Sequence, residues 1–417
     1  MIILFSILLF ILSIFNYLLV RSFLYPPFIF SFLWALLLLV LKFAGSMFYS
    51  ISHETLFLYL IGAVAFSIGG LFPLLFKYSR EKKVLLSEKS KWPEFVINIG
   101  LVFSLILLPY YLYYLIGAGL SSGFGNFWMG LKYQMVNNEM ILRAPLFRFK
   151  AFVGFTAILA YLEYKCGKVT KKKALLIIII AMVYELSTAQ RAGVFRLIFA
   201  LLGVKFMTEK KFDYKFLGKM LVLFFLMFTI PAILIGQIQK SSSLIEMFSS
   251  GIKLVVLYGV GGLVAFDKVI ASPSFYISPR ITTFRFFSAL LNILGYTKYE
   301  LPSFIPIITF TPLPTNVYTF YFSYFMDFGY FGLFMLTFLI GIFSSFIFMR
   351  AYYGKNNIFI FLYGLVIAVI LVSSMNEIFY TAISYWLQAI IFLLIVYKLP
   401  SLFRRREDEK GIRYSNS

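Results

Sequence analysis

The sequence predicts an all-α polytopic membrane protein with about eleven transmembrane helices, within a range of about ten to twelve. Hydrophobic residues make up 61% of the 417 residues and charged residues only 13%, a composition too apolar for a water-soluble domain of this length. Apolar runs of roughly 15 to 25 residues recur between short charged stretches, and a helix needs about 20 residues to cross the hydrocarbon core. The predicted solvent of this chain is therefore lipid.

The predicted spans follow the apolar runs in chain order. The first run leads directly into the second and lacks a basic segment before it, so we expect a retained span rather than a signal peptide. We place the spans at residues 1–20, 24–44, 55–76, 94–117, 150–164, 174–188, 193–208, 218–237, 318–348, 357–375 and 380–397.

Positive charge is concentrated in the loops on one side of this arrangement. The dense loops are residues 77–93, 165–173 and 207–219, together with the tail that begins at residue 398. The positive-inside rule makes this side cytoplasmic. We therefore expect a multi-pass protein of the cell (inner) membrane, with its N-terminus outside and its C-terminus in the cytoplasm. Residues 1–397 would form a single membrane domain, and residues 398–417 a disordered tail.

Two outer segments are longer than simple connections between helices. They cover residues 118–149 and 238–316, and they are the expected working parts. The second is rich in apolar residues between 242 and 271, which predicts helices lying in or dipping into the outer interface. The glycines at 259–262 are expected to break this stretch.

Several classes of chemistry are excluded by what the sequence lacks. A single cysteine and a single histidine exclude a disulfide framework and a Cys/His metal site. The chain has no P-loop motif, so it does not hydrolyse nucleotides through one. Its basic residues lie in short loops beside the spans rather than along one face, so we expect no nucleic acid as a partner. We also expect no metal site and no other cofactor.

The string Ser187–Gly193 lies between two apolar runs at the outer boundary and holds Gln190 and Arg191. Arg196 follows within the next apolar run, where an unpaired charge costs roughly 2.5–3.5 kcal/mol. Such a position implies a partner, and the nearest acidic residue is Glu185 in the preceding run. The alternative to a functional role is therefore an ion pair between Arg196 and Glu185 that joins two helices.

Two further arginines, Arg280 and Arg285, lie in the long outer segment among aromatic residues. The planar guanidinium group binds phosphate oxygens in pairs and stays charged at physiological pH. Arg191, Arg280 and Arg285 could thus form a cradle for a lipid diphosphate. The alternative is that each one anchors a lipid headgroup or forms a salt bridge in a loop.

Asn316 and Tyr318 precede a span that contains Asp327. A buried carboxylate is costly without a role or a partner, so Asp327 is either a base that acts on a sugar hydroxyl or a structural partner of an arginine. The glycines at 329 and 332 favour tight helix packing at this point. Glu377, at the outer end of the tenth run, is a further candidate, and its alternative is an interfacial charge that faces water.

Three of these features together resemble the O-antigen polymerase and oligosaccharide repeat unit polymerase families. They are the string Ala189–Gly193, the outer segment that bears arginines, and Asn316–Thr319 leading into Asp327–Gly332. The resemblance implies a GT-C-like glycosyltransferase that works without a metal. It would transfer a glycan from polyprenyl diphosphate to a sugar hydroxyl of the next lipid-linked repeat unit, on the outer membrane face.

The resemblance also suggests roles for individual residues and a set of partners. Partners would be the lipid-linked oligosaccharide, membrane lipids, a flippase and a chain-length regulator. Stabilisation of the leaving diphosphate and activation of the acceptor would be the catalytic tasks. The expected catalytic residues are Arg191, Arg280, Arg285 and Asp327, and the expected substrate-binding residues are Gln190, Arg196, Asn316, Tyr318 and Glu377.

Three other functions remain open from the sequence. An O-antigen ligase would use the same donor with a different acceptor. A flippase or other transporter is the candidate from a different class, although such proteins often contain internal repeats, and this sequence shows none. A structural or sensor protein is the third.

Overall fold

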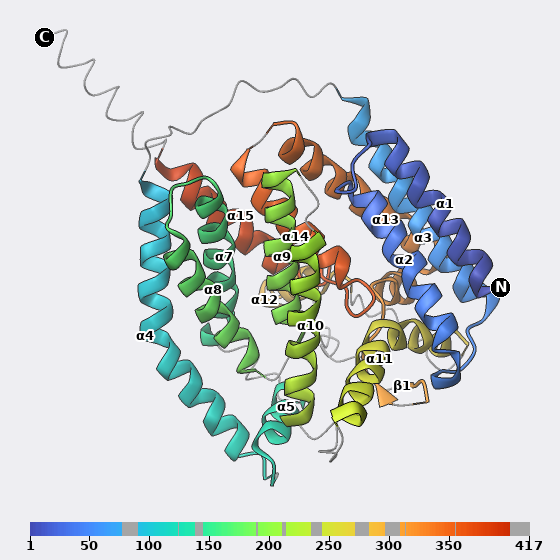
Figure 1. Cartoon of the computed structure of the whole chain (residues 1–417), viewed down its shortest axis with the longest axis horizontal. Helices are drawn as coiled ribbons and strands as arrows, with labels where there is room; N and C mark the ends of the chain where they lie inside the picture. Colours follow the sequence, from blue (N-terminus) through green and yellow to red (C-terminus); the bar gives the residue numbers. More distant parts are fainter. Residues whose placement is uncertain are drawn as a thin grey trace, which may run out of the picture.

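The structure is a computed structural model, and it is mostly helical (82%) (Figure 1). It describes residues 1–76, 91–123, 125–137, 145–188, 191–210, 214–234, 244–271, 283–296, 309–312, 314–354 and 356–400. Within these ranges, six helices are long and apolar enough to cross a membrane, and two shorter helices are also apolar. An all-α membrane protein is what these helices indicate, in agreement with the sequence.

The elements follow one another closely along the chain. The first four long helices are α1 (Ile2–Val20), α2 (Pro26–Phe43), α3 (His53–Leu71) and α4 (Trp92–Leu120), with short 3-10 turns at Gly45–Met47 and Phe72–Leu75. The middle of the chain forms α5 (Phe127–Asn137), α7 (Pro145–Lys165), α8 (Lys171–Leu186), α9 (Arg191–Glu209) and α10 (Tyr214–Leu234). The last part forms α11 (Leu244–Ile270), α12 (Arg285–Ile293), β1 (Thr309–Phe310), β2 (Pro314–Thr315), α13 (Tyr321–Tyr352), α14 (Asn357–Leu371) and α15 (Ile383–Tyr397).

The helices form two groups with a third between them (Figure 1). Helices α1, α2, α3 and α13 pack together on one side, and α4, α7, α8 and α15 on the other. Helices α9, α10 and α14 lie between these groups. The antiparallel pair β1–β2, in which Thr309 faces Thr315, packs against α11 at one end of the molecule.

Helix α1 docks through a narrow polar stripe. Its buried residues are Ser6, Leu9, Ser13 and Asn16, which recur every three or four residues and so share one face. Asn16 Nδ2 donates to Ser67 Oγ of α3 at 2.9 Å. Lipid tails are as apolar as leucine, so small and polar side chains hold membrane helices together better than further apolar contact does. The remaining faces of α1 are largely apolar and exposed.

Helices α3 and α13 approach closely because glycines line their contact. A β-carbon at Gly69 would lie 2.0 Å from the carbonyl oxygen of Phe338, and one at Gly341 would lie 2.2 Å from that of Phe66. Neither position has room for any side chain. These glycines therefore set the separation of the two helices.

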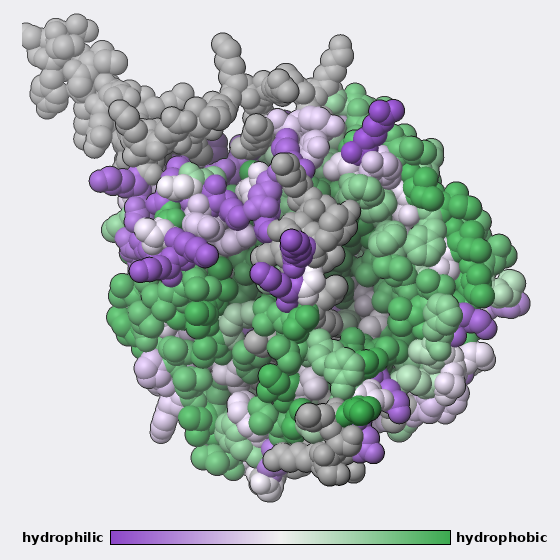
Figure 2. Space-filling view, in the orientation of Figure 1, coloured by the Kyte–Doolittle hydropathy of each residue, from purple (hydrophilic) through white to green (hydrophobic). Residues whose placement is uncertain are grey.

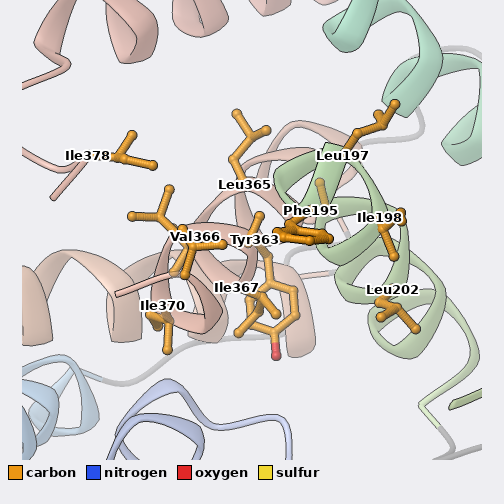
Figure 3. Close-up of a cluster of buried hydrophobic side chains, with 14 of the residues drawn as sticks. Phe195, Leu197, Ile198, Leu202, Tyr363, Leu365, Val366, Ile367, Ile370 and Ile378 are labelled. Atoms are coloured by element: carbon orange, nitrogen blue, oxygen red, sulfur yellow. The ribbon is translucent and has the colours of Figure 1, made fainter. Parts of the chain in front are cut away.

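Helices α9 and α14 form a second close contact in the centre of the molecule (Figure 3). A β-carbon at Gly203 would lie 2.9 Å from the Cα of Gly364, so the backbones meet there. The buried side chains around this contact include Phe195, Leu197, Ile198 and Leu202 of α9 and Tyr363, Val366, Ile367 and Ile370 of α14. This packing fixes α9, the helix that carries Arg191 and Arg196.

Helix α13 is broken at Gly329, whose φ of 62° and ψ of −151° are not helical. This backbone conformation is essentially restricted to glycine. A β-carbon at Gly329 would have nothing within 4 Å, so the predicted tight packing is wrong for this residue. At Gly332 a β-carbon would lie 2.0 Å from the Cβ of Phe328. Phe328 belongs to α13 itself, so this close contact is within the broken helix and not with a neighbouring one.

Helix α11 differs from the predicted interfacial segment. The glycines at 259–262 do not break it, because the helix runs through them from Leu244 to Ile270. Its second half is buried inside the protein, including Val260, Leu263 and Phe266. Glycine at 262 allows this, since a β-carbon there would lie 2.6 Å from the carbonyl oxygen of Ser374. By length and composition, this helix is also one of the six that can cross a membrane.

Hydrophilic residues gather at one end of the molecule, above a broad apolar band (Figure 2). This end holds the last residues of α7 and the first residues of α8 (Figure 1). Exposed lysines there include Lys171 and Lys172, and Lys165 pairs with Glu209 at 2.5 Å. The predicted basic loops 165–173 and 207–219 therefore lie at the same end. Most of the loop 77–93 and of the tail falls outside the described residues.

Candidate functional site

A basic cavity lies where α7, α8, α9 and α15 meet. Its volume is about 120 Å³, well above the roughly 10–15 Å³ that a cavity needs to hold one water molecule. Three cations line it, Arg148, Lys150 and Arg196, and among the described lining residues Glu185 is the one carboxylate. Tyr385 and Gln388 of α15 complete its polar lining. The described lining thus carries an excess of two positive charges.

The Glu185 carboxylate pairs with a lysine. Its Oε2 lies 2.8 Å from Lys150 Nζ, and both side chains are only 10% exposed. The predicted alternative, an ion pair between Glu185 and Arg196, is therefore wrong: in the part of the chain that the structure describes, no ion pair of Arg196 is found. The reason is that α7 packs against α8 and brings Lys150 to the carboxylate. Lys150 and Glu185 are far apart in the sequence, so the sequence does not reveal this contact.

Arg196 lies on the second turn of α9 and faces α15. Its guanidinium carbon lies 5.6 Å from the ring centroid of Tyr385, within the range of a cation–π interaction. An aromatic face compensates a cation less than a carboxylate does. Arg196 therefore leaves positive charge directed at the cavity.

Arg191 belongs to the same helix but to a different face. Arg196 follows it by five positions, which corresponds to about 140° around an α-helix and a rise of about 7.5 Å. Its guanidinium carbon lies 4.5 Å from the ring centroid of Phe228 and 5.0 Å from that of Tyr258. Arg191 therefore joins α9 to α10 and α11 rather than lining the cavity. The neighbouring Gln190 lies outside the described residues, as does Arg280.

A second cluster brings the start of α12 to α13, and its members include Arg285 and Asp327. The Thr283 amide donates to Asp327 Oδ2 at 2.7 Å, and Arg285 follows two residues later as the first residue of α12, 8% exposed. Between them, the Phe284 ring packs against Phe328. The structure thus brings together two of the residues that the sequence selected from distant segments.

Glu377 is enclosed by protein donors. It is 5% exposed and accepts hydrogen bonds from the Tyr324 hydroxyl at 2.6 Å, the Thr381 amide at 2.6 Å and the Tyr380 amide at 2.9 Å. Burial raises the pKa of its carboxyl, and these hydrogen bonds partly oppose the rise. The predicted alternative of a charge facing water is therefore wrong. Through these contacts, Glu377 attaches the segment that connects α14 with α15 to helix α13.

Tyr318 and Asn316 lie at the entrance to α13. Tyr318 is buried, its hydroxyl is 2.5 Å from Thr309 Oγ1, and its ring stacks on Phe322 at 4.3 Å. These contacts tie β1 to the start of α13. Asn316 is half-buried beside β2.

The clusters are linked through the segment before α15. Tyr380 packs against Phe284 of the second cluster, and Tyr385 faces Arg196 of the cavity. Five steps of extended chain span at most about 18 Å, so this is the greatest distance between the Cα atoms of Tyr380 and Tyr385.

No family model matches this chain, and neither does any curated protein or solved structure. The chemistry of the site is therefore inferred from its own residues. In the described ranges, no three residues among His, Cys, Asp and Glu come together as metal ligands.

The sequence reasoning missed Arg148, Lys150 and Asp267. The sequence places the first two at the end of the outer segment 118–149 and at the start of the span 150–164, whereas α7 begins at Pro145 and carries both on its first turns. The available signal was that Arg148 and Lys150 lie on the outer side, although positive charge in this chain is concentrated on the cytoplasmic side. Asp267 is buried and accepts from the Ser52 amide at the start of α3, which nothing in the local sequence predicts.

Proposed function

We propose that this chain is a polymerase of lipid-linked oligosaccharide repeat units, a membrane glycosyltransferase whose donor is a glycan on polyprenyl diphosphate. The observation that carries the proposal is the cavity, in which three cations face one carboxylate inside an apolar protein. Arg148 is exposed, Arg196 is half-buried, and Lys150 is paired with Glu185, so the described lining keeps two positive charges beyond that pair. Positive charge is costly beside apolar surroundings, and an anionic ligand would lower this cost. A lipid diphosphate supplies both the negative charge and an apolar tail.

The chemistry requires little more than positioned cations. The diphosphate is already a good leaving group, and the charge that develops on it is stabilised by donors held in a site of low dielectric constant. We assign this role first to Arg196, Arg148 and Lys150. The predicted arginine cradle is thereby revised, since Arg191 lies on another face of α9. Arg285 and Asp327 then hold the sugar part of the donor or the acceptor.

The topology belongs to the same proposal. Eleven helices, namely α1–α4, α7–α10 and α13–α15, would cross the membrane in a GT-C-like arrangement, with the C-terminus in the cytoplasm and the N-terminus outside. The cavity lies near the ends of α7, α8 and α9 opposite to the lysine-rich end, which the positive-inside rule makes the outer side. Repeat units that have already been carried across the cell membrane would meet the cavity there.

A transporter of lipid-linked oligosaccharides is the second candidate. The break of α13 at Gly329 favours it, because discontinuous helices are typical of transporter binding sites. The cavity, however, lies among α7, α8, α9 and α15 and not at this break. We therefore rank the transporter below the polymerase.

One experiment separates the two candidates. The gene is deleted in its host, the surface glycans are resolved by size, and wild-type protein and Arg196→Gln are supplied in turn. Loss of the long-chain ladder while single repeat units still reach the surface supports the polymerase. Loss of all surface repeats, with lipid-linked units accumulating inside, supports the transporter instead. Arg196→Gln is expected to restore at most a weak ladder.

A further inference from the structure

The Lys150–Glu185 pair is the most unusual feature of the cavity. It places a carboxylate inside a site whose other charges are positive, at 2.8 Å from one of the cations that would bind an anion. A carboxylate here competes with any anionic ligand, so it lowers the affinity of the site for its proposed substrate. A purely anion-binding cavity would be better without it.

The fold makes room for this carboxylate. Glycine at 193 lets Glu185 Oε2 lie against the backbone of α9, where a β-carbon would be 1.7 Å away. Glu185 also ends its helix at a defined point, since the Thr188 hydroxyl donates to its carbonyl oxygen at 2.9 Å. The carboxylate is therefore held in one place by two helices and a lysine.

The other candidate bases are less suited to accept a proton from a ligand in this cavity. Glu377 is occupied by three protein donors, and Asp327 accepts from the Thr283 amide. Neither lines the cavity. Glu185 does line it, and its ion-pair partner Lys150 lines it too, where this lysine could turn to a bound diphosphate.

We infer that Glu185 is the base that accepts the proton of the acceptor sugar hydroxyl, and that Lys150 occupies it until a donor diphosphate is bound. This inference rests on the proposed function. Donor binding draws Lys150 to the diphosphate and frees the carboxylate. The acceptor hydroxyl oxygen then forms a bond to the anomeric carbon of the donor glycan. The bond from that carbon to the diphosphate oxygen breaks with its electron pair, and the hydroxyl proton passes to Glu185.

The test compares Glu185→Gln with Arg196→Gln in purified full-length protein, using lipid-linked repeat units extracted from the deletion strain. General-base catalysis contributes about 10²–10⁴-fold, so Glu185→Gln should lower kcat by at least about 100-fold without raising the KM for the donor. Arg196→Gln should raise that KM. Inorganic pyrophosphate should inhibit Glu185→Gln at least as strongly as wild type, because a competing negative charge has been removed.

A matched control is Glu209→Gln. Glu209 also pairs with a lysine, Lys165 at 2.5 Å, but at the opposite end of α9. Its kcat and KM should stay at the wild-type values. A loss of kcat in Glu209→Gln equal to that in Glu185→Gln would overturn the assignment, since breaking any such pair would then have the same effect.

A double variant covers the case in which Glu185→Gln does not fold because the Lys150–Glu185 ion pair is lost. Lys150→Met/Glu185→Gln removes both charges and should have a kcat at least about 100-fold below that of Lys150→Met alone. Equal kcat values in these two proteins, or wild-type kcat in Glu185→Gln beside an impaired Arg196→Gln, would overturn the base and leave the polymerase standing. Wild-type protein that extends no lipid-linked unit would overturn the polymerase itself.

Discussion

The carboxylate of Glu185 lies directly against the Cα of Gly193, closer than any residue with a side chain at position 193 would allow. The two residues belong to successive helices, α8 and α9, and both line the cavity. The ion pair of Glu185 with Lys150 depends on this contact, because it sets the position of Oε2.

Gly193→Ala should therefore displace Glu185 from Lys150. We expect glycan transfer to fall by at least about 10-fold and stability to fall by about 1–3 kcal/mol, the usual effect of an overpacked interior. Polymer length in the deletion strain and thermal unfolding in detergent measure the two effects. Gly218→Ala, on α10 with nothing within 4 Å of its added carbon, is the control and should change neither. Unchanged activity and stability in Gly193→Ala would show that the contact is not needed.

Gly341→Ala should separate α13 from α3, since its added carbon would meet the Phe66 carbonyl oxygen at 2.2 Å. Backbone atoms cannot turn aside as a side chain does, so the loss should be about 3 kcal/mol or more. Gly117→Ala on α4 has open space around it and should be neutral. Unfolding midpoints of the two variants against wild type measure the difference. Equal midpoints would contradict the close contact of α3 with α13.

Asp267→Asn should weaken the attachment of α11 to α3. Asp267 Oδ1 accepts from the Ser52 amide and the Thr55 hydroxyl, each at 2.8 Å, at the positive end of the α3 dipole. Losing the charge should cost about 1–3 kcal/mol of stability. We expect the activity of the folded fraction to stay near that of wild type. A large fall in kcat with normal stability would instead assign Asp267 to the reaction.

Glu377→Gln tests whether this buried group binds substrate, as the sequence suggested, or only holds the fold. Two backbone amides point at its carboxylate, and an amide group can accept at only one of its two ends, so about 1–3 kcal/mol of stability should be lost. The KM for the donor in the folded protein should not change. A raised KM at wild-type stability would restore Glu377 to the substrate site.

The sequence determined the helices of this protein and the grouping of its charges. In lipid the backbone must satisfy its hydrogen bonds within each segment, so an apolar run of about 20 residues becomes a helix whatever its neighbours are. For this reason Arg196 falls inside the predicted span 193–208 and Arg191 just before it, and α9 begins two residues earlier than predicted, at Arg191. The basic loop after α7 was likewise visible as a local excess of lysine.

The tertiary structure alone decided which groups meet. Lys150, and not Arg196, reaches Glu185, because that pairing depends on how α7 packs against α8 and on the absence of a side chain at Gly193. The burial of α11 was also invisible, since an apolar stretch has the same composition whether it faces lipid or protein. Local sequence fixes hydrogen bonds within a helix, whereas contacts between helices depend on side-chain shape across segments that the sequence separates.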